Sequence, residues 1–351
     1  MRQNLCLLTC LLFTATGCGP GINGMPEEAL DSTYRGDLEV EASSDRSARS
    51  STRFPNRRVR NDTPTVPRAS QALMVDLIDS ENVESVIADE LFGPGIEVTN
   101  LQYSGNLEAI GTFSYEGDDL GLEEGLVLST GHALSAMGPN EQSQVTTQFY
   151  TAGDADLEPI SGYTTFDAAT IEFDFETASQ DLFALEFVLG SEEYPEFINS
   201  MFSDAFAVFI SENDTDLDPN IGAEPYNIAR MDNIANVDCD LVGDQITLWD
   251  MTPTTNPCLY IDNCSQTNND ELVDVYANLE GAEIEYDGLT RPLQLKIPVR
   301  PFVSYHIKIV IADGADAKFD TGVFIQSGSF RGATKIPAGP MGEAPFASKL
   351  R

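Results

Sequence analysis

The sequence predicts an all-β fold, an antiparallel β-sandwich of jelly-roll-like type with one short N-terminal helix. Three observations support this prediction. Many short apolar or alternating segments follow one another, turn residues separate them, and no helical segments are interleaved between them. This pattern is typical of antiparallel sheets packed face to face, because a parallel sheet needs a crossover helix between successive strands.

The predicted helix lies at residues 80–92 and precedes most of the predicted strands. Its apolar side chains recur at helical spacing, at Val83, Val86, Ile87 and Leu91. The helical pattern ends at the Gly-Pro-Gly of residues 93–95. The predicted strands show two-residue alternation or short apolar runs, and they cover residues 96–103, 126–129, 170–176, 182–189, 205–210, 293–299, 305–312 and 323–330.

The N-terminus has the layout of an export signal. Residues 1–17 carry Arg2, an apolar run and then small residues, which is the order of a secretory signal peptide. The ending Ala15-Thr16-Gly17-Cys18 resembles a bacterial lipobox, which implies lipidation at Cys18, although lipoboxes prefer Leu where Ala15 stands. The alternative is an ordinary signal peptide with an incidental cysteine. Because Gly19 is not the Asp that retains many such proteins in the inner membrane, we expect a lipoprotein held to the outer membrane at the cell surface.

The remainder of the chain divides by composition. Residues 18–70 are rich in Ser, Arg, Pro and acidic residues and contain few large apolar side chains, so we expect a disordered tether. Residues 71–332 form the predicted β domain, and the Pro- and Gly-rich residues 333–351 form a predicted flexible tail. No later segment has the 18 consecutive apolar residues that a membrane-spanning helix needs, so a lipid would be the anchor.

The charge of the chain excludes one class of partner. The 19 basic and 57 acidic residues give a net charge of −38. Nine of the basic residues precede residue 70, which leaves 10 basic and 49 acidic residues in the predicted domain and tail. A surface of this kind repels nucleic acid and attracts divalent cations or cationic partners.

Three cysteines remain after the two in the signal peptide and the one at the predicted lipidation site. They are Cys239, Cys258 and Cys264, and an exported protein can keep a disulfide among them. The odd number permits at most one pair, and the sequence leaves the pairing open. A zinc site is not expected, because no histidine lies close to these cysteines in the sequence.

Several long segments resemble the choice-of-anchor L domain family of exported bacterial proteins. They occur in the family's order at residues 98–113, 121–131, 166–175, 187–197, 202–211 and 305–325, and the strongest reads FVLGSEEYPEF from Phe187 to Phe197. The resemblance implies a β-sandwich and a surface location. It implies no chemistry, because a fold does not by itself determine a function. The chain departs from the family between residues 238 and 271, which form a longer segment that carries the three cysteines.

Two groups of acidic residues indicate a cation site. Glu193 and Asp204 belong to one, and Asp313 and Asp320 to the other. Carboxylates that follow strands into turns can converge on calcium, which accepts six to eight oxygen ligands, so we expect these four residues to include calcium ligands. The alternative is that they cap turns and strand ends through hydrogen bonds to the backbone.

The expected function is that of a surface-anchored extracellular binding, adhesion or matrix module that calcium stabilises. The expected partners are the outer membrane, through the lipid, and a surface glycan or protein ligand, with no nucleic acid. One alternative is a carbohydrate-binding module, and another is a hydrolase with paired carboxylates. We expect no enzyme, because the chain contains only His132 and His306 and lacks the Gly-x-Ser-x-Gly and His-Glu-x-x-His motifs.

Overall fold

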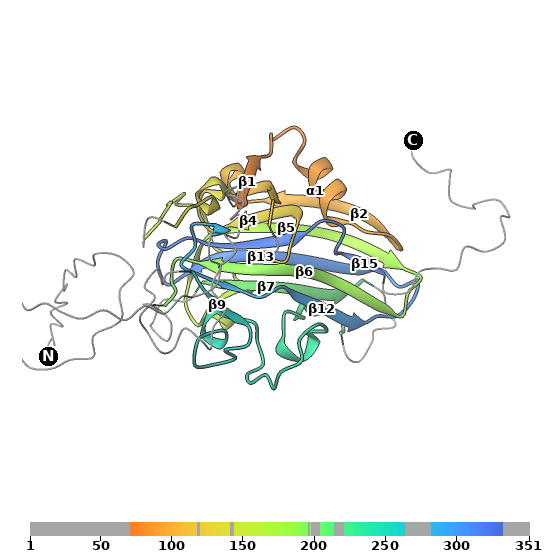
Figure 1. Ribbon diagram of the computed structural model, residues 1–351. Coiled ribbons are helices and arrows are strands. Elements are labelled where there is room, and N and C mark those ends of the chain that lie inside the picture. Colours follow the sequence, from red (N-terminus) through yellow and green to blue (C-terminus); the bar gives the residue numbers. More distant parts are fainter. Residues whose placement is uncertain are drawn as a thin grey trace, which may run out of the picture. The chain divides into compact units, whose positions relative to one another are not determined.

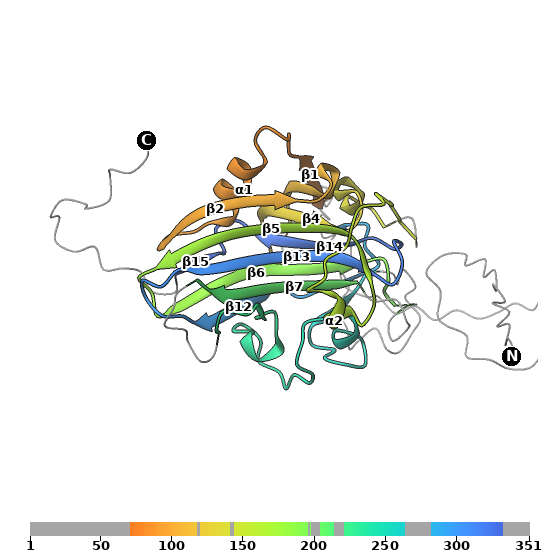
Figure 2. The same ribbon diagram turned by 180° about the vertical axis from the view of Figure 1, so that it is seen from behind.

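The computed structural model describes residues 71–117, 120–140, 144–195, 197, 204–213, 221–263 and 282–332. Within them the chain forms two sheets of mainly antiparallel strands packed as a sandwich, which confirms the predicted fold class. Figures 1 and 2 show this sandwich from opposite sides. The predicted signal peptide, tether and C-terminal tail lie outside the described residues.

The larger sheet has the strand order β10-β1-β3-β4-β14-β6-β11-β9, and β12 and β15 also pair with β6. Every pair in it is antiparallel except β1 with β10. Its strands are β1 (Gln71–Leu77), β3 (Ile110–Tyr115), β4 (Glu124–Ser129), β6 (Asp181–Ser191), β9 (Tyr260–Asp262), β10 (Ala282–Glu283), β11 (Gly288–Thr290), β12 (Leu293–Pro298), β14 (Thr321–Gln326) and β15 (Arg331–Gly332).

The smaller sheet has the order β2-β5-β13-β7-β8 and is antiparallel throughout. Its strands are β2 (Ile96–Ser104), β5 (Thr165–Thr177), β7 (Ala205–Glu212), β8 (Tyr226–Asn227) and β13 (Tyr305–Gly314). The predicted strands are therefore present, and β1, β3 and the short strands β8, β9, β10, β11 and β15 are additions that the apolar pattern did not single out.

The predicted helix is present as α1, Val83–Leu91, within the predicted span of residues 80–92. It buries the apolar face formed by Val83, Ile87 and Leu91 in the main core. A second, four-residue helix is α2, Glu158–Ser161. Short 3-10 turns are η1 (Leu107–Ala109), η2 (Ala133–Ala136), η3 (Met231–Asn233) and η4 (Leu248–Asp250).

The hydrophobic pattern differs between the two sheets because their faces meet different surroundings. In β5 of the smaller sheet, Ile171 and Phe173 enter the core between the sheets, while Glu172 stays partly exposed on the other face. In β4 of the larger sheet, Leu126 enters that core and the adjacent Val127 enters a second apolar cluster on the opposite face. A strand buried on both faces therefore reads as a continuous apolar run, and a strand with one outer face alternates.

Candidate functional site

One end of the sandwich gathers strand termini from both sheets. In the smaller sheet β13 ends where β5 and β7 begin, because Asp313 pairs with Phe166 and Ala312 pairs with Ala205. In the larger sheet β6 ends where β14 begins, at the pair formed by Ser191 and Thr321. We call the buried carboxyls at these termini the acidic cluster, which comprises Asp167, Glu192, Glu193, Asp204, Asp313 and Asp320.

Asp204 joins the two sheets at this end. Its Oδ2 accepts a hydrogen bond from the Thr321 hydroxyl at 2.5 Å, and its Oδ1 accepts one from the backbone N–H of Gly314 at 3.0 Å. The backbone N–H of Asp204 faces Glu193 Oε2 at 3.5 Å. Both oxygens of Asp204 therefore have donors, which is the turn-capping role that the sequence left open as an alternative.

Other oxygens of the cluster have no such partners. The side chains are 1% or 2% exposed, yet four of their oxygens accept no hydrogen bond: Glu192 Oε1, Glu193 Oε1, Asp313 Oδ1 and Asp320 Oδ2. Among the described residues no Lys, Arg or His forms an ion pair with these side chains. Because buried polar atoms in proteins are almost always paired, unpartnered carboxyl oxygens indicate a place where a further group binds.

Burial and mutual repulsion raise the pKa values of five of these carboxyls. Burial is the main cause, and it raises the pKa of Glu192 to about 10, that of Glu193 to about 8 and that of Asp320 to about 7. The pKa values of Asp204 and Asp313 are also raised well above the usual range by burial and by neighbouring carboxylates. Each of these two groups feels the charge of Glu193, so the charges lie close together.

An extended segment, residues 144–151, lies along the acidic cluster, and we call it the strap. Its alternate backbone N–H groups all donate to carboxylates of the cluster. The pairs are Val145 with Glu192 Oε2 at 3.3 Å, Thr147 with Asp320 Oδ1 at 2.8 Å, and Phe149 and Thr151 with the two oxygens of Asp167 at 3.0 and 2.6 Å. The strap thus supplies donors to one side of the cluster.

The Asp320 carboxyl packs directly against Gly131, where a larger side chain would not fit. A Cβ placed on Gly131 would lie 1.9 Å from Asp320 Oδ2, so any larger residue at position 131 collides with the acid. Gly131 follows β4 by two residues, and its backbone N–H donates a hydrogen bond to the Ser129 hydroxyl at 3.1 Å. The loop after β4 is therefore shaped around the acidic cluster.

The structure brings the four predicted cation ligands together and adds Glu192 and Asp167, which were not among the predicted ligands. Glu192 precedes Glu193 in the same motif, but strand alternation gave no reason to expect both side chains to be buried at one site. Asp167 lies near the start of β5 and has a positive φ of 48°, a backbone conformation that short polar side chains tolerate. An Asp at this position is therefore explained by the backbone, and it did not by itself indicate a cation ligand. Within the described part of the chain, no group of three or more Asp, Glu, His or Cys side chains is arranged so that it could hold a metal ion.

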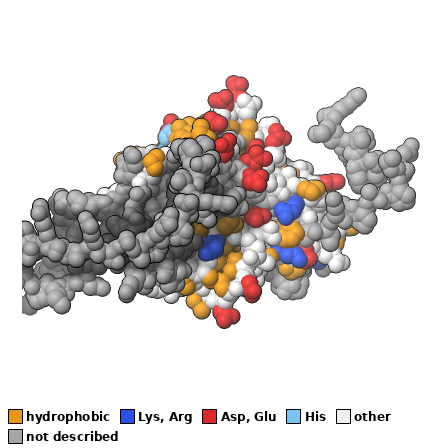
Figure 3. All heavy atoms as spheres, in the orientation of Figure 1, with side chains coloured by type: hydrophobic (Ala, Val, Ile, Leu, Met, Phe, Trp, Pro, Cys, Tyr) orange, Lys and Arg blue, Asp and Glu red, His pale blue; other side chains and the backbone are white. Residues whose placement is uncertain are grey.

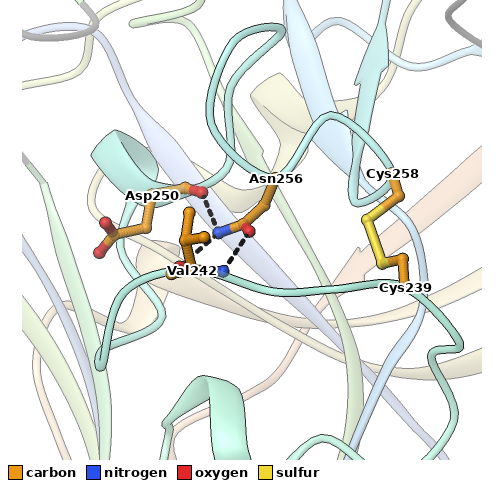
Figure 4. The surroundings of a disulfide bond; sticks show 5 residues. All are labelled: Cys239, Val242, Asp250, Asn256 and Cys258. Carbon is orange, nitrogen blue, oxygen red and sulfur yellow. Dashed lines mark hydrogen bonds between the residues drawn. A yellow bond between two sulfur atoms is a disulfide. The ribbon is translucent and has the colours of Figure 1, made fainter.

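The long segment after β8 is held by a disulfide and by one asparagine, as Figure 4 shows. The structure joins Cys239 to Cys258, and Cys264 lies outside the described residues. The Asn256 side chain bridges this loop: its amide donates to the carbonyls of Val242 and Asp250, both at 2.8 Å, and its oxygen accepts from the Val242 N–H at 2.7 Å. The segment is thus an ordered addition to the sandwich.

The two histidines have separate surroundings. His306 lies on the outer face of β13, where Nδ1 is 2.9 Å from Asp174 Oδ1 and Nε2 is 3.4 Å from Glu172 Oε1. His132 precedes η2, and its Nδ1 accepts a hydrogen bond from the Leu134 N–H at 3.2 Å. Neither forms an ion pair with the acidic cluster. On the face that Figure 3 shows, acidic side chains are spread widely and basic ones are few, in keeping with the net charge.

Comparison with known proteins identifies the family. The sequence model of the choice-of-anchor L domain matches residues 74–331, which is most of the chain. A search of curated proteins and a search of solved structures each returned no match. No helix among the described residues is long and apolar enough to span a membrane. The chain therefore belongs to the choice-of-anchor L domain family and is a surface-associated, exported module.

Proposed function

We propose that this protein is a surface-anchored attachment module whose sandwich is stabilised at one end by calcium bound to the acidic cluster. The supporting observation is the set of buried carboxyl oxygens without hydrogen-bond partners, contributed by termini of strands from both sheets. A cation would join those termini and lock the two sheets together at the end that holds the cluster.

Calcium suits this cluster better than other common metals. The donors are carboxyl oxygens, which are hard ligands, and calcium accepts six to eight of them in irregular geometry. Glu193 and Asp313 supply unpartnered oxygens, Asp320 and Glu192 supply further ones, and Asp204 holds the two sheets in register. Small rotations of these side chains would close the ligand set, and the cation would replace the protons that the buried carboxyls otherwise retain.

The test compares the thermal midpoint of the decalcified full chain with and without calcium, together with calorimetric titration. At a hundredfold excess over Kd, calcium should stabilise the fold by about 2.7 kcal/mol. The variant Glu193→Gln combined with Asp313→Asn should lose this response, since it removes two ligand charges. Glu186→Gln is the matched control, because Glu186 lies on β6, the strand that leads to Glu193, but accepts a hydrogen bond from Gln294 outside the cluster. An unchanged midpoint of the wild-type protein in calcium would rule out the site.

The anchoring half of the proposal concerns the N-terminus. A lipid on Cys18 would hold the module to the outer membrane, with residues 18–70 as the tether, and both lie outside the described residues. Clumping of cells that carry the protein, dependent on calcium, would support attachment to a surface glycan or protein. If chelation of calcium leaves the clumping unchanged, attachment does not depend on the cation site.

A further inference from the structure

The outer face of the smaller sheet carries a groove, and Thr151, the last residue of the strap, forms part of its lining. Residues 151–161 cross this face, and the apolar side chains of Leu157 and Ile160 pack on β7 and β13. Figure 2 shows α2, which belongs to this crossing segment, next to these strands. The crossing segment pairs with the start of β5 through the bridge between Ala152 and Phe166, and beside this bridge an open cavity is lined by residues of β5.

The groove consists of two adjoining cavities of about 390 and 110 Å3. Both are lined by Glu172 and Lys308, which face each other across the β5–β13 pair. The larger cavity is lined mainly by small and polar residues, among them Ser104, Thr151, Asp154 and Thr170. The smaller one adds Phe209, Pro225 and His306. The volume of the larger cavity is within the range of small-molecule sites, about 300–1,000 Å3.

The polar groups of the groove are held in fixed positions. Lys308 Nζ contacts Asp154 Oδ2 at 2.5 Å and Asp156 Oδ2 at 2.7 Å, so the ammonium is anchored at the centre of the groove. Glu172 contacts His306 at 3.4 Å through one oxygen. An ammonium has three donors, and a carboxylate has several acceptor positions, so both groups retain capacity for a ligand.

This lining favours a neutral, polyhydroxylated ligand. Adjacent sugar hydroxyls both donate and accept, which matches an ammonium beside a carboxylate and the Thr170 hydroxyl. The Thr151 hydroxyl donates to Asp167 Oδ1 at 3.0 Å, so toward a ligand it acts as an acceptor. The carboxylates outnumber the basic groups around the groove, which disfavours anionic ligands. The exposed Pro225 in the smaller cavity offers apolar surface to the C–H face of a second ring, while Phe209 is buried beneath Lys308.

We propose that this groove binds a neutral oligosaccharide, with Lys308 and Glu172 as the central hydrogen-bonding pair. The inference names the ligand class of the attachment function proposed above, and it does not depend on calcium at the acidic cluster. The two ideas can therefore fail separately.

The experiment applies the fluorescently labelled full chain to an array of neutral, anionic and cationic glycans, and then measures Kd for the best neutral glycan by calorimetry. Glu172→Gln and Lys308→Met should each weaken binding about tenfold, the loss expected for one hydrogen bond to a charged group. Thr170→Val, which removes a hydroxyl with little change in shape, should also weaken binding. It tests the groove independently if the Lys308→Met variant does not fold.

Two matched controls accompany these variants. Glu176→Gln makes the same change on the same strand beyond the groove, and Lys296→Met removes a lysine from β12 of the larger sheet. Both should leave Kd unchanged. The proposal is overturned if no neutral glycan binds, if only charged glycans bind, or if the groove variants bind as tightly as the controls. If calcium raises the thermal midpoint but no neutral glycan binds, the proposed cation site stands and the proposed glycan-binding groove is rejected.

Discussion

The dependence of stability on pH tests the acidic cluster most directly. Without a cation, folded Asp320 keeps its proton up to a pKa of about 7, whereas in the unfolded chain it ionises near its ordinary value of 3.8. Between these two values the folded state binds more protons than the unfolded state, so stability must fall as the pH rises. Glu193, whose pKa is raised to about 8, acts in the same direction.

The magnitude follows from the proton linkage. Each buried carboxyl that stays protonated only in the folded state costs about 1.4 kcal/mol per pH unit, so one such group lowers stability by about 2.7 kcal/mol from pH 5 to pH 7. For a domain of this size that corresponds to a decrease of about 5–10 °C in the thermal midpoint. With calcium bound the carboxylates are already ionised, and the decrease should disappear or reverse because protons compete with the cation.

The assay is scanning calorimetry of the decalcified full chain at pH 5, 6 and 7, with and without added calcium. Glu193→Gln should make the calcium-free decrease smaller, since the amide does not ionise. A midpoint that stays level or rises from pH 5 to pH 7 without calcium would refute the argument. So would parallel pH dependences in the presence and absence of calcium, because the cation would then not be acting on these carboxyls.

Three further predictions concern other parts of the chain. Gly131→Ala should destabilise the fold by about 1–3 kcal/mol in thermal unfolding, because the new methyl group overlaps the Asp320 carboxyl, and an unchanged midpoint would show that the carboxyl can move aside. Removing the disulfide by Cys239→Ser with Cys258→Ser should lower the free energy of unfolding in denaturant by about 3 kcal/mol, because the bond closes a loop with a sequence separation of 19. As the control, the variant and the wild-type protein should unfold identically under reducing conditions. Cys18→Ser should abolish labelling by a radioactive fatty acid and release the protein from membranes, and continued labelling would contradict lipidation at this residue.

Much of the fold could be predicted because local pattern and burial agree. The alternation in β5 and β13 and the apolar runs of β4 and β6 each identify a strand, and the helical spacing before residue 92 identifies α1. The shortest strands could not be predicted in this way, because two or three residues such as those of β10 and β11 have no measurable period. Their pairing depends on partners far away in the sequence.

The candidate site was only partly predictable for a similar reason. Acidic residues at strand ends indicated a cation site, but the sequence could not distinguish Asp204, whose oxygens both have donors, from Asp313, which has an unpartnered oxygen. The strap was not expected either, because its backbone donors meet carboxylates contributed by β5, by the residue that follows β6 and by the residue that precedes β14. The groove around Lys308 likewise requires the strand register to place Glu172 opposite it.

The sequence by itself therefore determined the all-β class, the helix, the family resemblance and the acidic character, since these depend on residue type and local spacing. The tertiary structure decided which carboxyls are buried together and that Cys239 pairs with Cys258. It also placed Lys308, held by an ion pair, in the groove on the outer face of the smaller sheet. The physical reason is that hydrophobic periodicity is a local property, whereas burial and hydrogen-bond partnership depend on which distant strands the register brings together.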